Sequence, residues 1–198
     1  MKSLFPCNVH EIKIKDFKII GDEVLKYIYQ ERKKIPGVIK SNRGGWQSPA
    51  IYADFDNILL STVQKEVGDY FSINRIFREG VKIDFLNMWI NINKKTNYNE
   101  THIHPASHLA GVWWIKVPKD SGKLFFNSPH WFEQYHEMIC YSDEFKEAVC
   151  TYPDYYIDSC EGGIVLFPSH LYHRVSESNS NQDRISVSFN INIWPPDR

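Results

Sequence analysis

The chain has 198 residues, of which 42% are hydrophobic and 15% aromatic, so the composition excludes an intrinsically disordered protein. Lys and Arg (23) nearly balance Asp and Glu (24), and the net charge of −1 gives no signature of a nucleic-acid or polybasic membrane partner. The length predicts one domain, 1–198. The N-terminus lacks the apolar run of a signal peptide and no transmembrane segment is evident, so we expect a cytoplasmic protein with four reduced cysteines.

Residues 1–80 are predicted to form an N-terminal support of helices and a strand. Residues 7–15 alternate enough between apolar and polar to form a strand. Asp22 is a plausible N-cap for a helix over about 23–34. A second helix is predicted over 55–71, where apolar residues recur at helical spacing.

From residue 81 to 198 the pattern changes to short runs of β-branched and aromatic residues separated by turn-forming residues. The predicted strands are 81–93, 110–118, 122–127, 162–168, 172–176 and 184–194. Because no helical pattern intervenes, we expect a mainly β fold with flanking N-terminal helices, built as an antiparallel sandwich or barrel. Residues 128–160 lack a clear period and are predicted to form a lid-like insertion.

Two of the eight histidines, His102 and His104, are separated by one residue next to a predicted strand. In extended backbone, residues i and i+2 point to the same face, so their imidazoles should converge. Two neighbouring imidazoles on the inner face of a barrel make half of a metal site, and a third ligand is needed. His173 lies on a later predicted strand, whereas His170 falls in the turn before it, so the pattern favours His173.

The remaining histidines have no such support. We expect His108 to be a polar loop residue and His130 and His136 to be surface or lid residues. Five aromatic residues are candidates for shaping the pocket: Trp113, Trp114, Trp131, Phe132 and Tyr135. The alternative is that Trp113 and Trp114 belong mostly to the core and that 131–135 is a packed loop.

Arg184 begins the last predicted strand and shares one face of it with Ser186, Ser188 and Asn190. An arginine on the interior face of a barrel needs an anion, because an unpaired buried guanidinium is costly. Its planar fork suits a carboxylate, and the Ser186 hydroxyl can add a hydrogen bond. The sequence therefore predicts three imidazoles for a metal and an Arg/Ser pair for a carboxylate.

In these motifs the chain resembles the 2-oxoglutarate–Fe(II) oxygenase family that carries a His-x-His-Pro sequence. The resemblance spans about residues 44–193. The segments that carry it are GGWQS (44–48), WIN (89–91), HIHP (102–105), LAGVWWIKVP (109–118), GGIVLFPSHLYHRV (162–175) and RISVSFNI (184–191).

The resemblance implies a double-stranded β-helix (jelly-roll, cupin-like) core. In the wider superfamily Fe(II) is held by a His-x-Asp/Glu pair and a distal His. His102 and His173 match the two histidines, and Arg184 and Ser186 match the residues that hold the distal carboxylate of 2-oxoglutarate. Asn91 is a further candidate for binding the co-substrate.

His104 departs from the wider pattern, because it stands where the superfamily has a carboxylate. Either His104 binds the metal and gives a three-His site, or it turns aside and water or another group fills the position. We favour ligation by His104. Three-His sites also suit other divalent metals, so the departure bears on the identity of the metal.

The function implied is that of a dioxygenase that uses Fe(II), 2-oxoglutarate and O2 to hydroxylate a substrate, with release of succinate and CO2. The substrate is a small molecule or a protein side chain, and a free edge strand is compatible with a homodimer. Two alternatives remain at this point. One is a cupin-like three-His metalloenzyme that does not use 2-oxoglutarate, and the other is a non-enzymatic jelly-roll binding or structural module.

Overall fold

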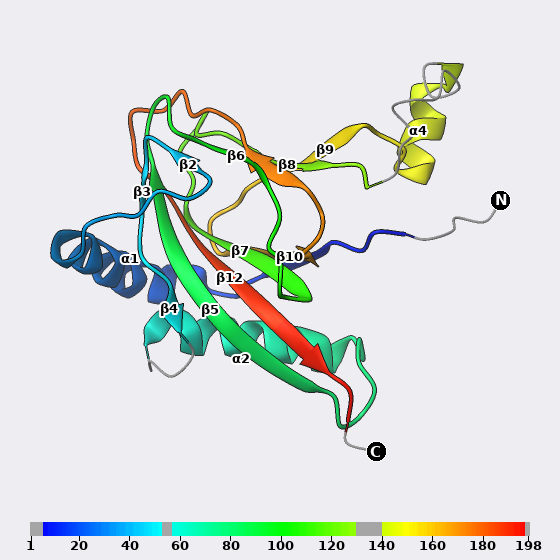
Figure 1. Ribbon diagram of the computed structural model, residues 1–198, viewed down its shortest axis with the longest axis horizontal. Coiled ribbons are helices and arrows are strands. Elements are labelled where there is room, and N and C mark those ends of the chain that lie inside the picture. Colours follow the sequence, from blue (N-terminus) through cyan, green and yellow to red (C-terminus); the bar gives the residue numbers. More distant parts are fainter. Residues whose placement is uncertain (1–5, 53–56, 130–139, 197–198) are drawn as a thin grey trace.

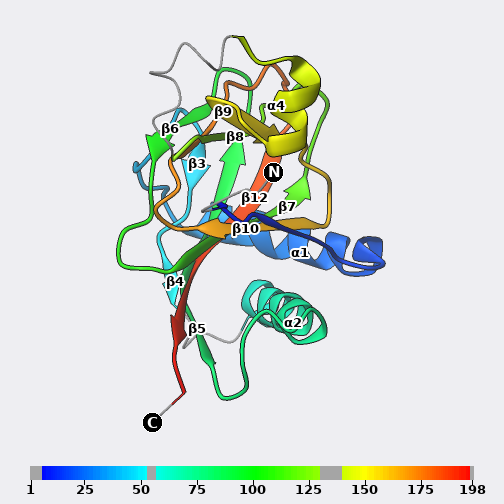
Figure 2. The same ribbon diagram turned by 90° about the vertical axis from the view of Figure 1, so that its right-hand side faces the viewer.

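The protein is described here by a computed structural model that covers residues 6–52, 57–129 and 140–196. Its strands form two antiparallel sheets (Figures 1 and 2). Sheet A has the order β1-β10-β7-β12-β5-β3, with β4 also paired to β5, and sheet B has the order β2-β6-β11-β8-β9. The two sheets pack on each other, which confirms the predicted jelly-roll fold.

The strands of sheet A are β1 (His10–Lys13), β3 (Trp46–Gln47), β4 (Ile51–Tyr52), β5 (Lys82–Asn93), β7 (Leu109–Lys116), β10 (Gly163–Pro168) and β12 (Arg184–Trp194). Those of sheet B are β2 (Asn42–Arg43), β6 (Tyr98–His102), β8 (Leu124–Asn127), β9 (Asp154–Ile157) and β11 (His173–Val175). The helices are α1 (Phe17–Lys34), α2 (Ile58–Ile73) and α4 (Asp143–Val149). Among the described residues, no helix is long and apolar enough to cross a membrane.

Helix α1 begins earlier than the sequence suggested. Its N-cap is Asp16, in a left-handed conformation, so Asp22 lies inside the helix and the expectation that it is the cap was wrong. Phe17 extends the apolar face that continues through Val24 and Ile28, and burial of this face favours the longer helix. Helix α2 is capped by Asn57, whose side-chain oxygen accepts hydrogen bonds from two backbone N–H groups at 3.0 Å.

Sheet A separates two cores of different composition. Helices α1 and α2 cover one face of the sheet, where alternate residues of its central strands, among them Ile90, Trp113 and Val187, are fully buried. The opposite face of the same strands looks toward sheet B and contributes to a smaller core. Side chains alternate between the two faces of a strand. In β5 and β12, therefore, one set of residues packs in the apolar core under the helices, and the alternate set places polar groups on the face toward sheet B.

Gly111 lies opposite Phe189 on the neighbouring strand. A Cβ atom at Gly111 would lie 2.2 Å from the Phe189 ring, so only glycine allows the ring to cross the strand there. The glycine of the segment LAGVWWIKVP (109–118) therefore has a packing cause.

Part of the predicted insertion at 128–160 is described. Strand β9 extends sheet B by pairing with β8, and α4 has no buried residue. Figure 1 shows α4 and β9 at the end of sheet B away from β2. The described part of the insertion therefore lies at the β9 margin of sheet B, with β8 between it and β11.

Candidate metal centre

The predicted ligands lie on neighbouring elements of sheet B. His102 is the last residue of β6 and lies directly opposite His173, the first residue of β11. Cross-strand neighbours have Cβ atoms about 5 Å apart, so this register alone brings two imidazoles together.

His104 lies in the loop that follows β6. The backbone N–H of His104 donates to the Ser169 carbonyl at 2.9 Å, and Ser107 Oγ donates to the His104 carbonyl at 3.0 Å. These bonds tie the loop to the turn that precedes β11, so His104 is held against the strand that carries His173.

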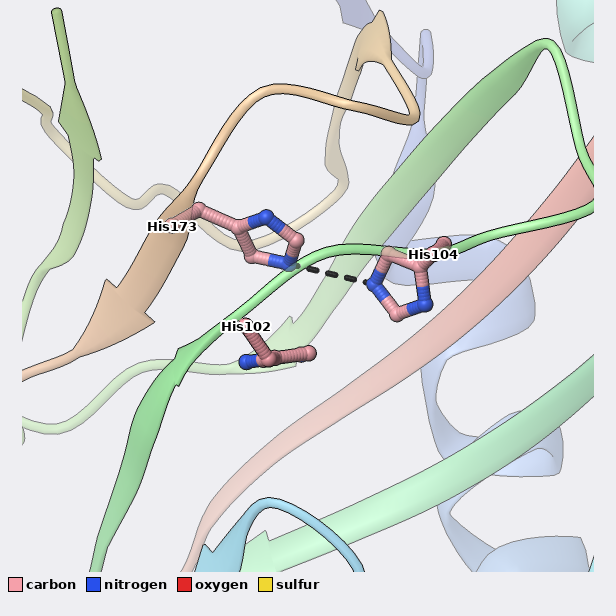
Figure 3. Close-up of side chains that lie close together, drawn as sticks. All are labelled: His102, His104 and His173. Carbon is pink, nitrogen blue, oxygen red and sulfur yellow. Dashed lines mark hydrogen bonds between the residues drawn. The ribbon is translucent and has the colours of Figure 1, made fainter.

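The three imidazoles lie close together, with His104 and His173 joined by a hydrogen bond and His102 beside them (Figure 3). One ring nitrogen from each residue lies within 4.8 Å of the other two. The ring centroids are 5.0 Å apart for His102 and His104, 4.3 Å for His102 and His173, and 4.9 Å for His104 and His173.

Backbone carbonyls fix the tautomer of the His102 and His173 imidazoles. His173 Nδ1 lies 2.9 Å from the Leu171 carbonyl, and His102 Nδ1 lies 2.7 Å from the Glu100 carbonyl. A carbonyl can only accept, so each Nδ1 carries the proton and each Nε2 keeps a lone pair. Hydrogen bonds of this kind orient metal-binding histidines and fix their tautomer.

Burial keeps all three rings uncharged. Desolvation, aided by the neighbouring imidazoles, lowers the pKa of His173 to about 3 and that of His104 to about 4. The pKa of His102 is also lowered, chiefly by burial. Metals bind the neutral form of imidazole. At neutral pH, therefore, no imidazolium has to lose a proton before a cation can bind at this site.

The distance between His104 Nε2 and His173 Nε2 is 3.1 Å. Two nitrogens bound at about 2.1 Å to one metal lie about 3.0 Å apart in cis octahedral positions and about 3.4 Å apart in tetrahedral ones. In the metal-free chain this contact is a hydrogen bond between the two rings, and its length is also compatible with both nitrogens binding one metal. The cluster found among the described residues contains no carboxylate, and Glu100 pairs with Arg43 instead.

Arg184 lies on the inner face of sheet A, with only 2% of its surface exposed. Within the described part of the chain its guanidinium has no carboxylate partner, its Nε makes no hydrogen bond, and its Nη2 makes one long bond of 3.4 Å to Ser159 Oγ. Burial lowers its pKa to about 10, so it stays charged at neutral pH. A buried, unneutralised guanidinium fits an anionic ligand such as 2-oxoglutarate.

Ser186 and Asn91 face each other across β12 and β5 on this inner face. Asn91 Nδ2 donates to Ser188 Oγ at 3.1 Å, while Asn91 Oδ1 has no partner among the residues described. Trp114 neighbours Ser186 on β7, and its buried Nε1 is likewise without an acceptor in the described chain. Arg184 Nε and Trp114 Nε1 are thus two buried donors without an acceptor in the described chain.

The other predicted residues lie elsewhere. His170 is exposed, and His108 is an exposed loop residue whose Nδ1 accepts from the Ile193 backbone at 3.0 Å. Trp113 points into the helix-covered core. His130, Trp131, Phe132, Tyr135 and His136 lie outside the described residues.

Sequence reasoning missed a cavity of about 730 Å³ beside the imidazoles. Its walls come from residues 38–50, β5, β6 and β12, and they include His102 and His104. Ser41 also lines it and lies 3.4 Å from His102 Nε2. These wall residues carry no spacing pattern in the sequence, so only the folded chain identifies them.

Several solved structures share the fold, and each of the following three is named as a prolyl hydroxylase or was solved with bound 2-oxoglutarate. A prolyl-4-hydroxylase from Pseudomonas putida has a TM-score of 0.63 at 12% identity, over 93% of this chain and 92% of that one. A viral collagen prolyl hydroxylase from Paramecium bursaria Chlorella virus-1 was solved with 2-oxoglutarate. It has a TM-score of 0.57 at 15% identity, over 92% of this chain and 94% of that one. HygX from Streptomyces hygroscopicus, solved with nickel and 2-oxoglutarate, has a TM-score of 0.59 at 9% identity, over 94% and 83%. Comparison with curated proteins finds no match.

Residues 87–190, more than half of the chain, match the family described as "Putative 2OG-Fe(II) oxygenase". The chain therefore belongs to this family and is a 2-oxoglutarate/Fe(II)-dependent oxygenase, with O2 as the usual co-substrate. This confirms the resemblance read from the sequence. It also decides against a metalloenzyme that does not use 2-oxoglutarate and against a non-enzymatic jelly roll.

Proposed function

We propose that this oxygenase hydroxylates a small molecule or a protein side chain, and that it releases succinate and CO2. In this proposal His102, His104 and His173 hold Fe(II) through their Nε2 atoms. The convergence of three neutral imidazoles supports this set. When bound, Fe(II) and 2-oxoglutarate supply the oxidising chemistry that places one atom of O2 in a C–H bond.

The single observation that carries the proposal is the buried Arg184 with no carboxylate partner in the described chain. Its guanidinium binds the distal carboxylate of 2-oxoglutarate, and the Ser186 hydroxyl and the Trp114 indole N–H are placed on the same inner face to add hydrogen bonds. The side-chain N–H of Asn91 donates to Ser188 Oγ. In this proposal Asn91 therefore positions the polar residues of β12 and does not itself bind the carboxylate.

The protein's own residues orient and shield the reactants. The carbonyls of Glu100 and Leu171 fix two imidazoles, and the bond from His104 to Ser169 fixes the loop that carries the third. The apolar residues of the smaller core, among them Phe126 and Phe167, pack around His173 and exclude water from that side.

The test is to supply Fe(II), ascorbate and 2-oxoglutarate and to measure succinate. We expect succinate to form in proportion to active enzyme, and none to form when a chelator removes the iron. Succinate formation that does not depend on added iron would contradict the proposal, and so would the absence of succinate from protein shown to hold one Fe(II) per chain.

A further inference from the structure

The buried guanidinium of Arg184 makes one hydrogen bond within the described chain. Its acceptor is Ser159 Oγ, which lies 3.4 Å from Arg184 Nη2. Ser159 belongs to the segment 158–162, which joins β9 to β10. It lies outside every sequence motif noted above, so its position beside Arg184 emerges only in the folded chain.

Backbone pairing places the segment 158–162 next to Arg184. At the end of the segment, the Gly162 N–H donates to the Trp114 carbonyl of β7 at 2.8 Å. Trp114 in turn lies opposite Ser186, two residues beyond Arg184 on β12. The same strand pairing that builds the anion site therefore brings Ser159 to the guanidinium.

The two carboxylates of this segment bind other groups. Asp158 is exposed and forms an ion pair with Lys123 at 3.4 Å. Glu161 Oε1 accepts a hydrogen bond from the Val117 backbone N–H at 3.0 Å. The side chain that contacts the guanidinium of Arg184 is the neutral serine between these two acidic residues.

A hydroxyl and a carboxylate at this place would affect the guanidinium differently. A hydroxyl can accept one N–H and so restrict the orientation of the planar guanidinium, while the positive charge stays uncompensated. A carboxylate would form a charge-assisted pair with the guanidinium and would compete with any anionic ligand. Burial enlarges the difference, because a charge removed from water depends on its nearest partner.

We propose that Ser159 is a positioning residue of the anion site, which orients Arg184 through a neutral hydrogen bond and leaves its charge for the distal carboxylate of 2-oxoglutarate. The inference rests on the proposed function and deepens it, because it adds to the co-substrate site a residue from a connecting segment. Ser159 acts through Arg184 and needs no contact with 2-oxoglutarate itself.

The test measures two quantities, the Kd of N-oxalylglycine by calorimetry on Zn(II)-loaded protein and the Tm of the protein without this analogue. Ser159→Asp places a carboxylate at the guanidinium. We expect it to weaken binding of the analogue at least about tenfold, because the two carboxylates compete for Arg184. We expect it also to raise the Tm, because a buried charge gains a counter-charge.

Two milder variants separate orientation from packing. Ser159→Ala removes the acceptor and should weaken the analogue about fivefold, which corresponds to one lost hydrogen bond. Ser159→Thr keeps the hydroxyl and should bind the analogue as the unaltered protein does. Ser72→Asp, an exposed change of the same charge on α2, should leave the Kd unchanged.

The proposal is overturned if Ser159→Asp binds the analogue as tightly as the unaltered protein or lowers the Tm, since a serine that only packs would give these results. It is also overturned if Ser159→Ala keeps full affinity or if Ser159→Thr loses it. Arg184→Leu, measured alongside, separates the two hypotheses. Full affinity in Arg184→Leu would contradict the proposed 2-oxoglutarate site itself, whereas weak binding by Arg184→Leu with unaffected Ser159 variants would reject the role of Ser159 alone.

Discussion

The two faces of β12 differ in what they require of the sequence. The face toward the helices carries Ile185, Val187, Phe189 and Ile191, and all four side chains are fully buried among apolar groups. The face toward sheet B carries Arg184, Ser186 and Ser188, which are also buried but polar. The apolar face is fully packed by other residues of the protein. On the polar face, Arg184 lacks a carboxylate partner in the described chain.

The contrast shows that one strand can stabilise the fold with one face and bind a ligand with the other. Apolar burial stabilises the fold by roughly 25 cal/mol for each Å² removed from water. A buried guanidinium without a partner instead costs free energy until a ligand neutralises it. Substitutions on the apolar face should therefore lower the free energy of unfolding, whereas substitutions on the polar face should change the KM for 2-oxoglutarate.

The largest effect is expected at the imidazoles. His102→Ala and His173→Ala should each reduce succinate formation to background, because a ligand of the metal is lost. Metal content should fall, while circular dichroism of the metal-free protein should stay unchanged. His170→Ala removes an exposed imidazole three residues from His173 and should retain full activity. Iron-dependent turnover in either ligand variant would show that the assignment is wrong.

On the helix-covered face, Phe189→Ala should destabilise the fold by about 3–5 kcal/mol, because it opens a cavity in the apolar core. Ser188→Ala on the other face removes one hydrogen-bond acceptor of Asn91 and should cost about 1 kcal/mol. Urea unfolding at equilibrium measures both. Equal losses would remove the distinction between the two faces.

Arg184→Leu should raise the KM for 2-oxoglutarate by about 10- to 100-fold, because a charge-assisted pair is lost. Its Tm without 2-oxoglutarate should stay the same or rise, since a buried charge without a counter-ion has been removed. Arg174→Leu breaks a partly exposed ion pair with Asp154 and should leave this KM unchanged. An unaltered KM in Arg184→Leu would exclude Arg184 from the co-substrate site.

The metal-free protein should lose stability in acid. Burial holds the pKa of His104 near 4 and that of His173 near 3, against about 6.5 for an unfolded imidazole. Between these values the unfolded chain binds protons that the folded chain does not, so stability is complete above about pH 6.5 and falls as the pH drops toward 4. Tm at pH 7 and pH 5 measures the effect. The double variant His104→Gln/His173→Gln should show a smaller difference, and an identical one would contradict these pKa values.

The smallest effect is expected at Ser186. Ser186→Ala should raise the KM for 2-oxoglutarate about fivefold, which corresponds to the loss of one hydrogen bond of about 1 kcal/mol. Tm should change little, because the residue lies on the polar face. A KM equal to that of the unaltered protein would leave Arg184 as the main contact for the carboxylate.

The long strands could be predicted because burial on both sides of sheet A leaves a clear pattern of β-branched residues in β5, β10 and β12. Strands β2, β3 and β4 have two residues each and carry no such pattern. Strand β6 reads Tyr-Asn-Glu-Thr-His, which is polar, and only its pairing with β11 and β2 makes it a strand.

The candidate metal site was predictable for a different reason. His102 and His104 are linked by local geometry, and one strand pairing adds His173, so few long-range contacts are needed. The cavity wall is different. Gln47, Asn87 and Asn190 come from distant segments, and an isolated asparagine or glutamine on a strand has no feature that marks it as a wall residue. Their juxtaposition depends on the pairing of β3, β5 and β12, which the sequence does not specify.

The most direct test of the account is an anaerobic crystal structure of the protein with Fe(II) and N-oxalylglycine. The account predicts a metal bonded to Nε2 of His102, His104 and His173, with the distal carboxylate of the analogue on the Arg184 guanidinium. A metal that leaves His104 unbound would contradict the three-imidazole site. An analogue whose carboxylate lies away from Arg184 would contradict the central claim that the polar face of β12 exists to bind an anion.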